Sequence, residues 1–177
     1  MKIILIAAIS ADGKIAQSAN QSSLDWTSKE DTAFFVAKTK EAGVVVMGSR
    51  TFETIGKPLK GRRLIVLSEQ GGKGGEVDEV DKVAQVEFRN QNPKELVEDL
   101  AREGVTQLVI GGGSSVYSQF LQAGLVTDVF LTIEPILFGS GIPLAQGFDR
   151  IQMSLVDVTK LNEQAILMHY QIGSPRL

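Results

Sequence analysis

Short runs of β-branched and other apolar residues alternate along this chain with segments of helical periodicity, and this alternation limits the possible folds more than any other feature. Several early runs are apolar throughout, which is typical of strands covered by helices on both faces of a parallel sheet. The last two runs follow each other without a helix between them and predict an antiparallel hairpin. The predicted strands are residues 2–10, 44–47, 64–67, 85–88, 107–110, 126–133, 153–161 and 165–172, and the predicted helices are residues 29–42, 50–55, 93–102 and 115–123. The sequence therefore predicts an α/β fold, with a mostly parallel central sheet, an antiparallel C-terminal edge and about four flanking helices.

The length of 177 residues is enough for one domain with a buried core. We therefore expect residues 1–177 to form a single domain, with a short tail at residues 173–177. A surface loop is expected at residues 70–75, where four glycines flank Lys73.

Composition excludes several kinds of function. The chain has no cysteine and one histidine, His169, which excludes thiolate and multi-histidine metal sites, so we expect no bound metal. The net charge of −3 arises from 18 basic and 21 acidic residues that are interspersed, and no nucleic-acid partner is expected. The apolar run at residues 3–9 is interpreted as a strand rather than a signal peptide, and no run approaches the roughly 18 residues of a membrane helix. A cytoplasmic protein without a membrane partner is expected.

Three glycines at residues 111–113 end one predicted strand and precede residues 114–117, which open a predicted helix. Glycine lets a ligand approach the main chain, and a helix start offers free N–H groups that suit a pyrophosphate. Such a junction is a common ligand site in open α/β sheets. The alternative is a tight turn that packs the helix closely on the sheet. The spacing matches neither the G-x-G-x-x-G fingerprint nor a Walker A loop.

A second junction of this kind lies at residues 47–51. We expect Ser49 to cap the following helix, with Arg50 and Thr51 adding a cation and a hydroxyl there. Ser68, after the strand at 64–67, is expected to add a hydroxyl near the same edge. Two junctions after parallel strands suit a ligand with two separated phosphate groups, whereas simple helix capping is the alternative for Ser49.

Asp31 lies on the same face of the first long helix as Phe34 and Phe35. A carboxylate among apolar side chains is unfavourable unless a partner binds it, and burial raises its pKa, so a ligand-binding or proton-transfer role is one interpretation. Helix capping is the other, because Ser28 and Asp31 have the spacing of a capping box, as do Thr27 and Glu30. The residues alone leave both open.

Together these segments resemble the dihydrofolate reductases and the wider superfamily that contains the riboflavin-pathway pyrimidine reductases. The resemblance covers residues 3–135, and its most specific stretch is residues 46–62. Trp26 and Asp31 have the family's five-residue separation. Further matching positions are Ile6, Ala7, Ala8, Asp12, Gly13, Lys14, Ile15, Phe35, Leu67, Ser68, Ile110, Gly111, Gly112, Gly113, Tyr117 and Thr132.

The resemblance implies an NADPH-dependent reductase in which Asp31 and Trp26 are catalytic. Asp31 would bind the pterin ring and assist protonation, and Arg62 would pair with the α-carboxylate of a folate tail. A cis peptide is implied between Gly111 and Gly112. The implied substrate contacts are Ile6, Ala8, Asp31, Phe35, Ile55, Arg62 and Thr132. The implied cofactor contacts are Ala8, Ile15, Ala16, Gly48, Ser49, Arg50, Thr51, Leu67, Ser68, Ile110, Gly111, Gly112, Gly113, Ser114, Ser115, Val116 and Tyr117.

The expected reaction is reduction of 7,8-dihydrofolate to tetrahydrofolate, with hydride transfer to C6 and protonation of N5. Residues 9–16 and 135–144 are more similar to the pyrimidine reductases, so reduction of a ribosylated aminopyrimidine is the alternative reaction. A non-catalytic NADP-binding protein is a third possibility. The protein is expected to be a monomer or a homodimer.

Overall fold

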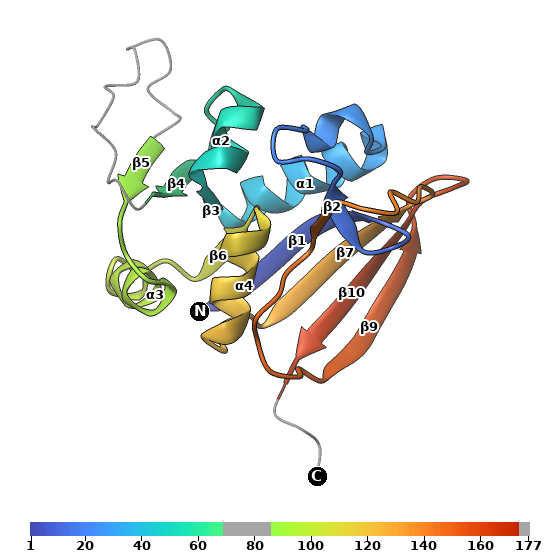
Figure 1. The fold of residues 1–177 in the computed structure, drawn as a ribbon. Coiled ribbons are helices and arrows are strands. Elements are labelled where there is room, and N and C mark those ends of the chain that lie inside the picture. Colours follow the sequence, from blue (N-terminus) through green and yellow to red (C-terminus); the bar gives the residue numbers. More distant parts are fainter. Residues whose placement is uncertain (69–85, 174–177) are drawn as a thin grey trace.

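The computed structural model describes residues 1–68 and 86–173, so the loop expected at 70–75 and most of the expected tail lie outside the described residues. Eight strands form one sheet in the order β5-β4-β3-β6-β1-β7-β10-β9 (Figure 1). They are β1 Lys2–Ser10, β3 Val44–Gly48, β4 Arg63–Leu67, β5 Val86–Arg89, β6 Gln107–Ile110, β7 Asp128–Glu134, β9 Met153–Lys160 and β10 Ile166–Ile172. β1 and β3 to β7 pair in parallel, whereas β10 and β9 are added antiparallel at the β7 side. The expected α/β architecture is confirmed.

Four helices connect the strands, as expected from the helical periodicity. They are α1 Lys29–Ala42, α2 Ser49–Ile55, α3 Pro93–Arg102 and α4 Ser114–Gln122. The bounds of β1, α1, α3 and β6 coincide with the predicted bounds. α3 begins with Pro93, and Asn92 and Glu95 form a capping box at its start. α1 is followed by the C-cap residue Gly43, which has a left-handed φ of 76°. Among the described residues, no helix has the length and apolar character that crossing a membrane requires.

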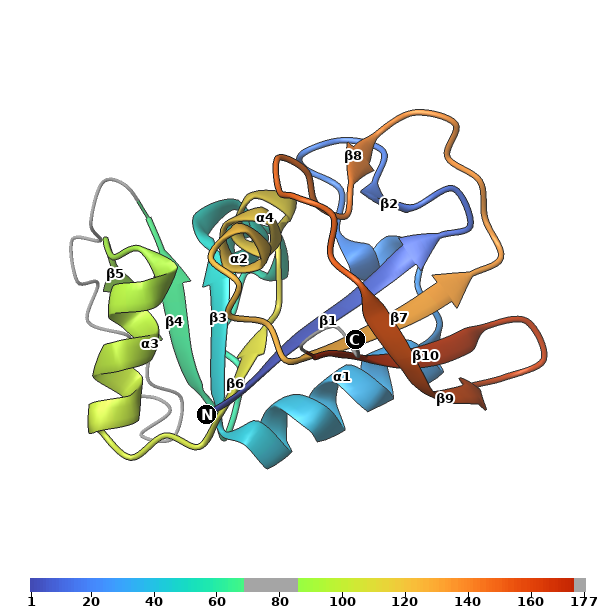
Figure 2. The ribbon, with the colours of Figure 1, turned by 90° about the horizontal axis from the view of Figure 1, so that it is seen from below.

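Both faces of the central sheet are buried, as the uninterrupted apolar strands predict. Successive side chains of a strand point to opposite faces, so Ile3 and Leu5 of β1 join one core cluster and Ile4 and Ile6 the other. The first cluster contains buried side chains of α3 and α4, and the second is covered by Phe34 and other side chains of α1 and α2. Figure 2 shows α1 and α4 on opposite sides of the sheet.

The sequence analysis missed a two-stranded sheet formed by β2 (Lys14–Ala16) and β8 (Ile142–Pro143), and a 3₁₀ helix at Ser23–Asp25. These elements are too short to show periodicity. Asp12 connects the same two segments, because its carboxylate accepts hydrogen bonds from the N–H groups of Phe138 at 3.1 Å and Gly139 at 2.9 Å. Its carboxylate also accepts the Ser10 hydroxyl, and these hydrogen bonds lower the pKa of Asp12. The loop after β1 is thereby held against the loop after β7.

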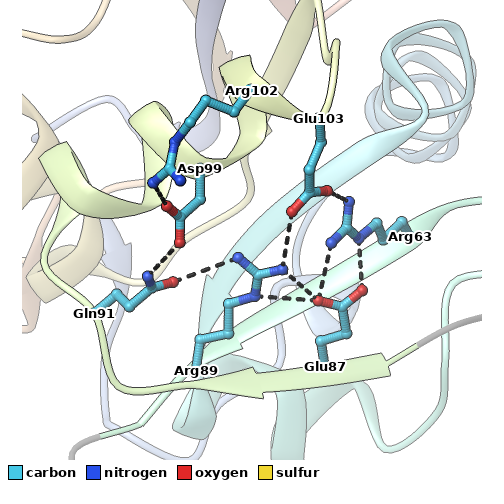
Figure 3. Close-up of polar contacts among 7 residues, drawn as sticks. All are labelled: Arg63, Glu87, Arg89, Gln91, Asp99, Arg102 and Glu103. Carbon is cyan, nitrogen blue, oxygen red and sulfur yellow. Dashed lines mark hydrogen bonds and ion pairs between the residues drawn. The ribbon is translucent and has the colours of Figure 1, made fainter.

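A network of charged side chains fixes the other edge of the sheet (Figure 3). Glu87 of β5 accepts hydrogen bonds from Arg63 of β4 at 2.6 Å and Arg89 of its own strand at 2.8 Å. Arg63 also pairs with Glu103, the C-cap residue that follows α3. The network as drawn comprises Arg63, Glu87, Arg89, Gln91, Asp99, Arg102 and Glu103. It connects β4, β5 and α3.

Candidate active site

The glycine cluster lies where β3 and β6 end side by side. Gly111 donates its N–H to Val46 at 2.8 Å, and Gly48 donates its N–H to Gly112 at 2.8 Å. The cis peptide joins Gly112 to Gly113, not Gly111 to Gly112 as the resemblance implied. Hydrogen bonds to β3 thus continue through Gly111 and Gly112, beyond the end of β6 at Ile110.

The glycines allow main chain and side chains to pack more closely than a Cβ would permit. A Cβ on Gly113 would lie 3.0 Å from the Thr51 hydroxyl, and one on Gly48 would lie 3.2 Å from Val116. A Cβ on Gly112 would lie 3.3 Å from the Tyr117 hydroxyl, at a φ of +106° that also favours glycine. The close-packing interpretation of the cluster is therefore confirmed, and its contact with a ligand stays a prediction.

The starts of α2 and α4 have no side-chain cap. α4 begins after Gly113, and α2 begins at Ser49 after Gly48, so Ser49 is the first helical residue and the prediction that it caps this helix is wrong. Gly48 takes the capping position because β3 extends one residue further than expected. The N–H groups at the start of α4, together with the glycine main chain, suit a phosphate group.

The remaining predicted cofactor residues are spread around this junction. Leu67 pairs with Gly48 across β4 and β3, and Ile110 ends β6. Ser68 donates its N–H to Arg89, Ser115 accepts a hydrogen bond from Gln119 on an exposed face, and Arg50 is exposed. Ile15 and Ala16 lie on β2, Ser114 opens α4, and Ala8 follows Ile6 along β1.

Asp31 is 8% exposed, in the first turn of α1. The Ser28 hydroxyl caps this helix by accepting the N–H of Asp31 at 3.3 Å. The capping group is therefore the side chain of Ser28 and not the carboxyl group of Asp31. In a capping box, that carboxyl group would accept the N–H of Ser28. Here Glu134 accepts it instead, at 2.7 Å. The geometry thus supports a ligand-binding or proton-transfer role for Asp31 rather than helix capping by its carboxyl group.

Three side chains from other elements surround Asp31. Burial raises the pKa of Asp31, the nearby Thr132 hydroxyl of β7 opposes this rise, and the Glu134 carboxylate of the same strand adds to it. Tyr117 of α4 donates its hydroxyl to the carbonyl of Ile6 at 2.6 Å, and burial and the negative charge of Asp31 raise the pKa of Tyr117. The Thr132 hydroxyl and the Trp26 indole N–H are buried and have no hydrogen-bond partner within the described chain. Such groups suit a polar ligand or ordered water.

Aromatic side chains connect this acid to the glycine junction and the loops. Phe35 lies one turn beyond Asp31 on α1, and its ring would be 3.5 Å from a Cβ on Gly111. Trp26 packs edge-on against Phe138, with 5.1 Å between ring centroids. Since Phe138 is held by Asp12, the contact places Trp26 beside the loop that carries Ile15 and Ala16.

Arg62 is a buried cation that pairs with no acidic side chain among residues 1–68 and 86–173. It is 6% exposed, and it donates to the Thr39 hydroxyl at 2.8 Å and to the Lys60 carbonyl at 3.1 Å. Burial lowers its pKa, but a guanidinium remains charged at neutral pH. Within the described residues no carboxylate pairs with it, so it retains donors for an anionic ligand group.

Phe52 and Ile55 of α2 belong to the same apolar cluster as the Phe34–Phe35 pair of α1.

The sequence analysis did not identify Glu134 or the contact between Asp12 and Phe138. For Glu134 a signal was present, because Thr132 and Glu134 are two residues apart on one strand and therefore share a face. For Asp12 and Phe138 no local pattern indicated contact, since 126 residues separate them.

Comparison with known proteins gives one family. The family described as the RibD C-terminal domain matches residues 1–167. A dihydrofolate reductase of Neisseria meningitidis is 33% identical over 138 residues, which cover 76% of each chain. A protein from Shewanella sp. PV-4 that is named for riboflavin biosynthesis has a TM-score of 0.84 and 21% identity, covering 98% of this chain and 100% of that one. A diaminohydroxyphosphoribosylaminopyrimidine deaminase/5-amino-6-(5-phosphoribosylamino)uracil reductase from Thermotoga maritima has a TM-score of 0.80 and 19% identity, covering 97% of this chain and 56% of that one.

Proposed function

The chain belongs to the RibD C-terminal domain family, and from that premise we propose that it is an NADPH-dependent reductase whose substrate is a ribosylated aminopyrimidine. NADPH is the cofactor of this family and of the related dihydrofolate reductases. When bound, it supplies a hydride. The remaining chemistry, which is orientation of the substrate and delivery of a proton, falls to side chains of the chain itself.

The observation that carries the proposal is the buried carboxyl group of Asp31 next to the glycine junction. Reduction of a C=N bond adds a hydride to carbon and a proton to nitrogen, so the site needs a group that holds a proton at neutral pH. Burial favours the protonated form of Asp31. The unpartnered Trp26 N–H and Thr132 hydroxyl supply hydrogen-bonding groups that orient a heterocyclic ring or a water.

The glycine junction fits the nucleotide end of NADPH. The main chain at residues 111–113 is bare of side chains, and the uncapped start of α4 directs N–H groups at the same place. We retain the predicted cofactor contacts on β2, β3, α2 and α4 as proposals. Arg50 and Ser68 are the proposed contacts for the adenosine phosphates.

Arg62 supports a substrate with an anionic end. A guanidinium that is buried, charged and free of carboxylates binds a phosphate or a carboxylate through charge-assisted hydrogen bonds. The ribosyl phosphate of the aminopyrimidine is the anionic group in our proposal. The α-carboxylate of a folate tail is the corresponding group in dihydrofolate.

Dihydrofolate remains a second candidate substrate, and the similarity to the Neisseria enzyme favours it. The match to the RibD C-terminal domain family favours the aminopyrimidine more strongly, because it covers residues 1–167 of this chain, whereas the Neisseria enzyme aligns over 138 residues. The expectation that dihydrofolate is the main substrate therefore gives way to the alternative.

Steady-state NADPH oxidation with each substrate tests the proposal. We expect turnover with the phosphoribosylated aminopyrimidine, and a KM that rises roughly tenfold or more in Arg62→Lys, since an ammonium does not reproduce the planar donor pair of arginine. The matched control is Arg63→Lys, because Arg63 binds Glu87 and Glu103 at the far edge of the sheet.

Turnover with dihydrofolate but not with the aminopyrimidine would establish the second candidate. An equal rise in KM for an aminopyrimidine riboside without phosphate would remove Arg62 from phosphate binding. Binding of NADPH without turnover of either substrate would support a non-catalytic protein.

A further inference from the structure

Glu134 is the last residue of β7 and is 4% exposed. One of its oxygens, Oε1, accepts two hydrogen bonds from Ser28, from the N–H at 2.7 Å and from the hydroxyl at 2.7 Å. Ser28 in turn accepts the N–H of Asp31 through its hydroxyl oxygen. Glu134, Ser28 and Asp31 thus form one hydrogen-bonded chain from the sheet to the first turn of α1.

This arrangement replaces a capping box. In that motif, the residue three positions after the cap accepts the N–H of the cap residue, and here that residue is Asp31. Since Glu134 already accepts this N–H, the carboxyl group of Asp31 is released from the helix start. An acid that is 106 residues from Ser28 in the sequence therefore leaves Asp31 available to the site.

The two buried carboxyl groups are also unequal. Glu134 accepts two hydrogen bonds, which stabilise a carboxylate, whereas Asp31 has only the nearby Thr132 hydroxyl. Among the described residues no lysine, arginine or histidine forms an ion pair with either group. Two adjacent carboxylates without a cation repel each other, so the charge of Glu134 adds to burial in raising the pKa of Asp31.

We propose that Glu134 is a positioning residue for Asp31: it takes over the helix-capping role and, through its own negative charge, keeps the proton on Asp31 ready for the substrate nitrogen. This inference rests on the proposed reductase function and names a residue that the reaction uses indirectly. The groups that face Asp31 are Glu134 and Thr132 of β7 and Tyr117 of α4, and the Tyr117 hydroxyl is engaged with Ile6. The adjacent Glu30 is exposed and binds Asn162 of the β9–β10 turn.

The test is the titration of the Asp31 carboxyl carbon, followed by carbon-13 NMR in protein without substrate or cofactor and assigned with Asp31→Asn. Glu134→Gln keeps an acceptor for Ser28 but removes the charge, so we expect the Asp31 titration midpoint to fall by about one pH unit. In turnover assays, the pH at which the rate declines on the alkaline side should fall by a similar amount. The matched control is Glu30→Gln, which removes an exposed charge next to Asp31 in sequence and should leave the midpoint unchanged.

An unchanged Asp31 midpoint in a folded Glu134→Gln protein would overturn the inference and leave Glu134 as a helix cap only. If Glu134→Gln does not fold, Ser28→Ala weakens the carboxylate form of Glu134 instead, and a smaller fall in the same direction is expected; no fall would again overturn it. The NMR readout is independent of the reaction. A shifted midpoint without turnover would therefore reject the proposed function and retain the link between Glu134 and Asp31.

Discussion

The ionisable side chain of Asp31 is buried, and an uncharged side chain at this position would give a more stable fold. Burial raises its pKa above the ordinary value of 3.8, so the folded state binds the proton more tightly than the unfolded chain does. Its contribution to stability is therefore largest below pH 3.8 and is lost as the pH rises through the folded-state pKa. This is the direction expected of a functional acid rather than a structural one.

We predict that Asp31→Asn is more stable than the natural protein at neutral pH, because the natural side chain must either bury a charge or take up a proton far above its ordinary pKa, whereas an amide does neither. Urea unfolding at a series of pH values measures this, and the advantage of the variant should diminish steadily as the pH falls toward 3.8. A variant that is less stable at neutral pH would indicate that the Asp31 carboxylate has a partner that stabilises it.

The loops that carry β2 and β8 approach each other through a close main-chain contact between Gly141 and Ala16. Gly141 precedes β8 and has a φ of +135°, and a Cβ at this position would lie 2.3 Å from the carbonyl oxygen of Ala16 on β2. Gly147 also has a positive φ, +77°, but a Cβ there would have no atom within 4 Å. Alanine substitutions at Gly141 and Gly147 therefore distinguish the effect of backbone strain alone from the added effect of a clash with Ala16.

We predict that Gly147→Ala lowers the free energy of unfolding by about 1 kcal/mol, the usual penalty for a left-handed alanine. Gly141→Ala should lower it by at least about 1 kcal/mol more, because main chain cannot move aside as easily as a side chain. It should also speed amide exchange at residues 14–16 and reduce turnover. Equal effects of the two substitutions on stability, exchange and turnover would show that the β2–β8 contact does not hold the loop.

The sequence pattern predicted the strands and helices of four or more residues and missed those of two or three. β1 and α1 coincide with their predicted bounds, because β1 is an almost continuous apolar run of 9 residues and α1 is a 14-residue segment that begins directly after the capping residue Ser28. β2 and β8 have 3 and 2 residues, which is too few for a pattern. The alternatives at Asp31 needed the structure for a different reason. They depended on Glu134, whose contact with Ser28 arises only from the pairing of β7 with β1 and the placement of α1 on the sheet.

At the scale of the whole molecule, the charged network at β4, β5 and α3 helps to hold the edge strand β5 on the sheet. Hydrogen bonds from Arg63 and Arg89 lower the pKa of Glu87, so its contribution is present above its ordinary pKa of 4.5 and is lost as the pH falls. Networks of this kind contribute more than isolated surface pairs, because each arginine is already ordered by another partner.

We predict that Glu87→Gln lowers the free energy of unfolding by roughly 1 kcal/mol at neutral pH and low salt, with the difference shrinking in high salt and below pH 4.5. Thermal or urea unfolding under these conditions provides the measurement. Glu163→Gln is the control, because Glu163 pairs with Lys160 in solvent and its loss should have almost no effect. A Glu87→Gln protein as stable as the natural one would show that the network is not needed to hold β5.

The most direct test of the proposed reaction is isotope transfer. The protein is mixed with the phosphoribosylated aminopyrimidine and NADPH that carries deuterium at the transferred position, and the product is examined by mass spectrometry. We predict one deuterium per product molecule, at a rate that falls roughly 10²- to 10⁴-fold in Asp31→Asn while NADPH affinity changes little. Deuterium transferred only to dihydrofolate, or an undiminished rate in Asp31→Asn, would contradict the account.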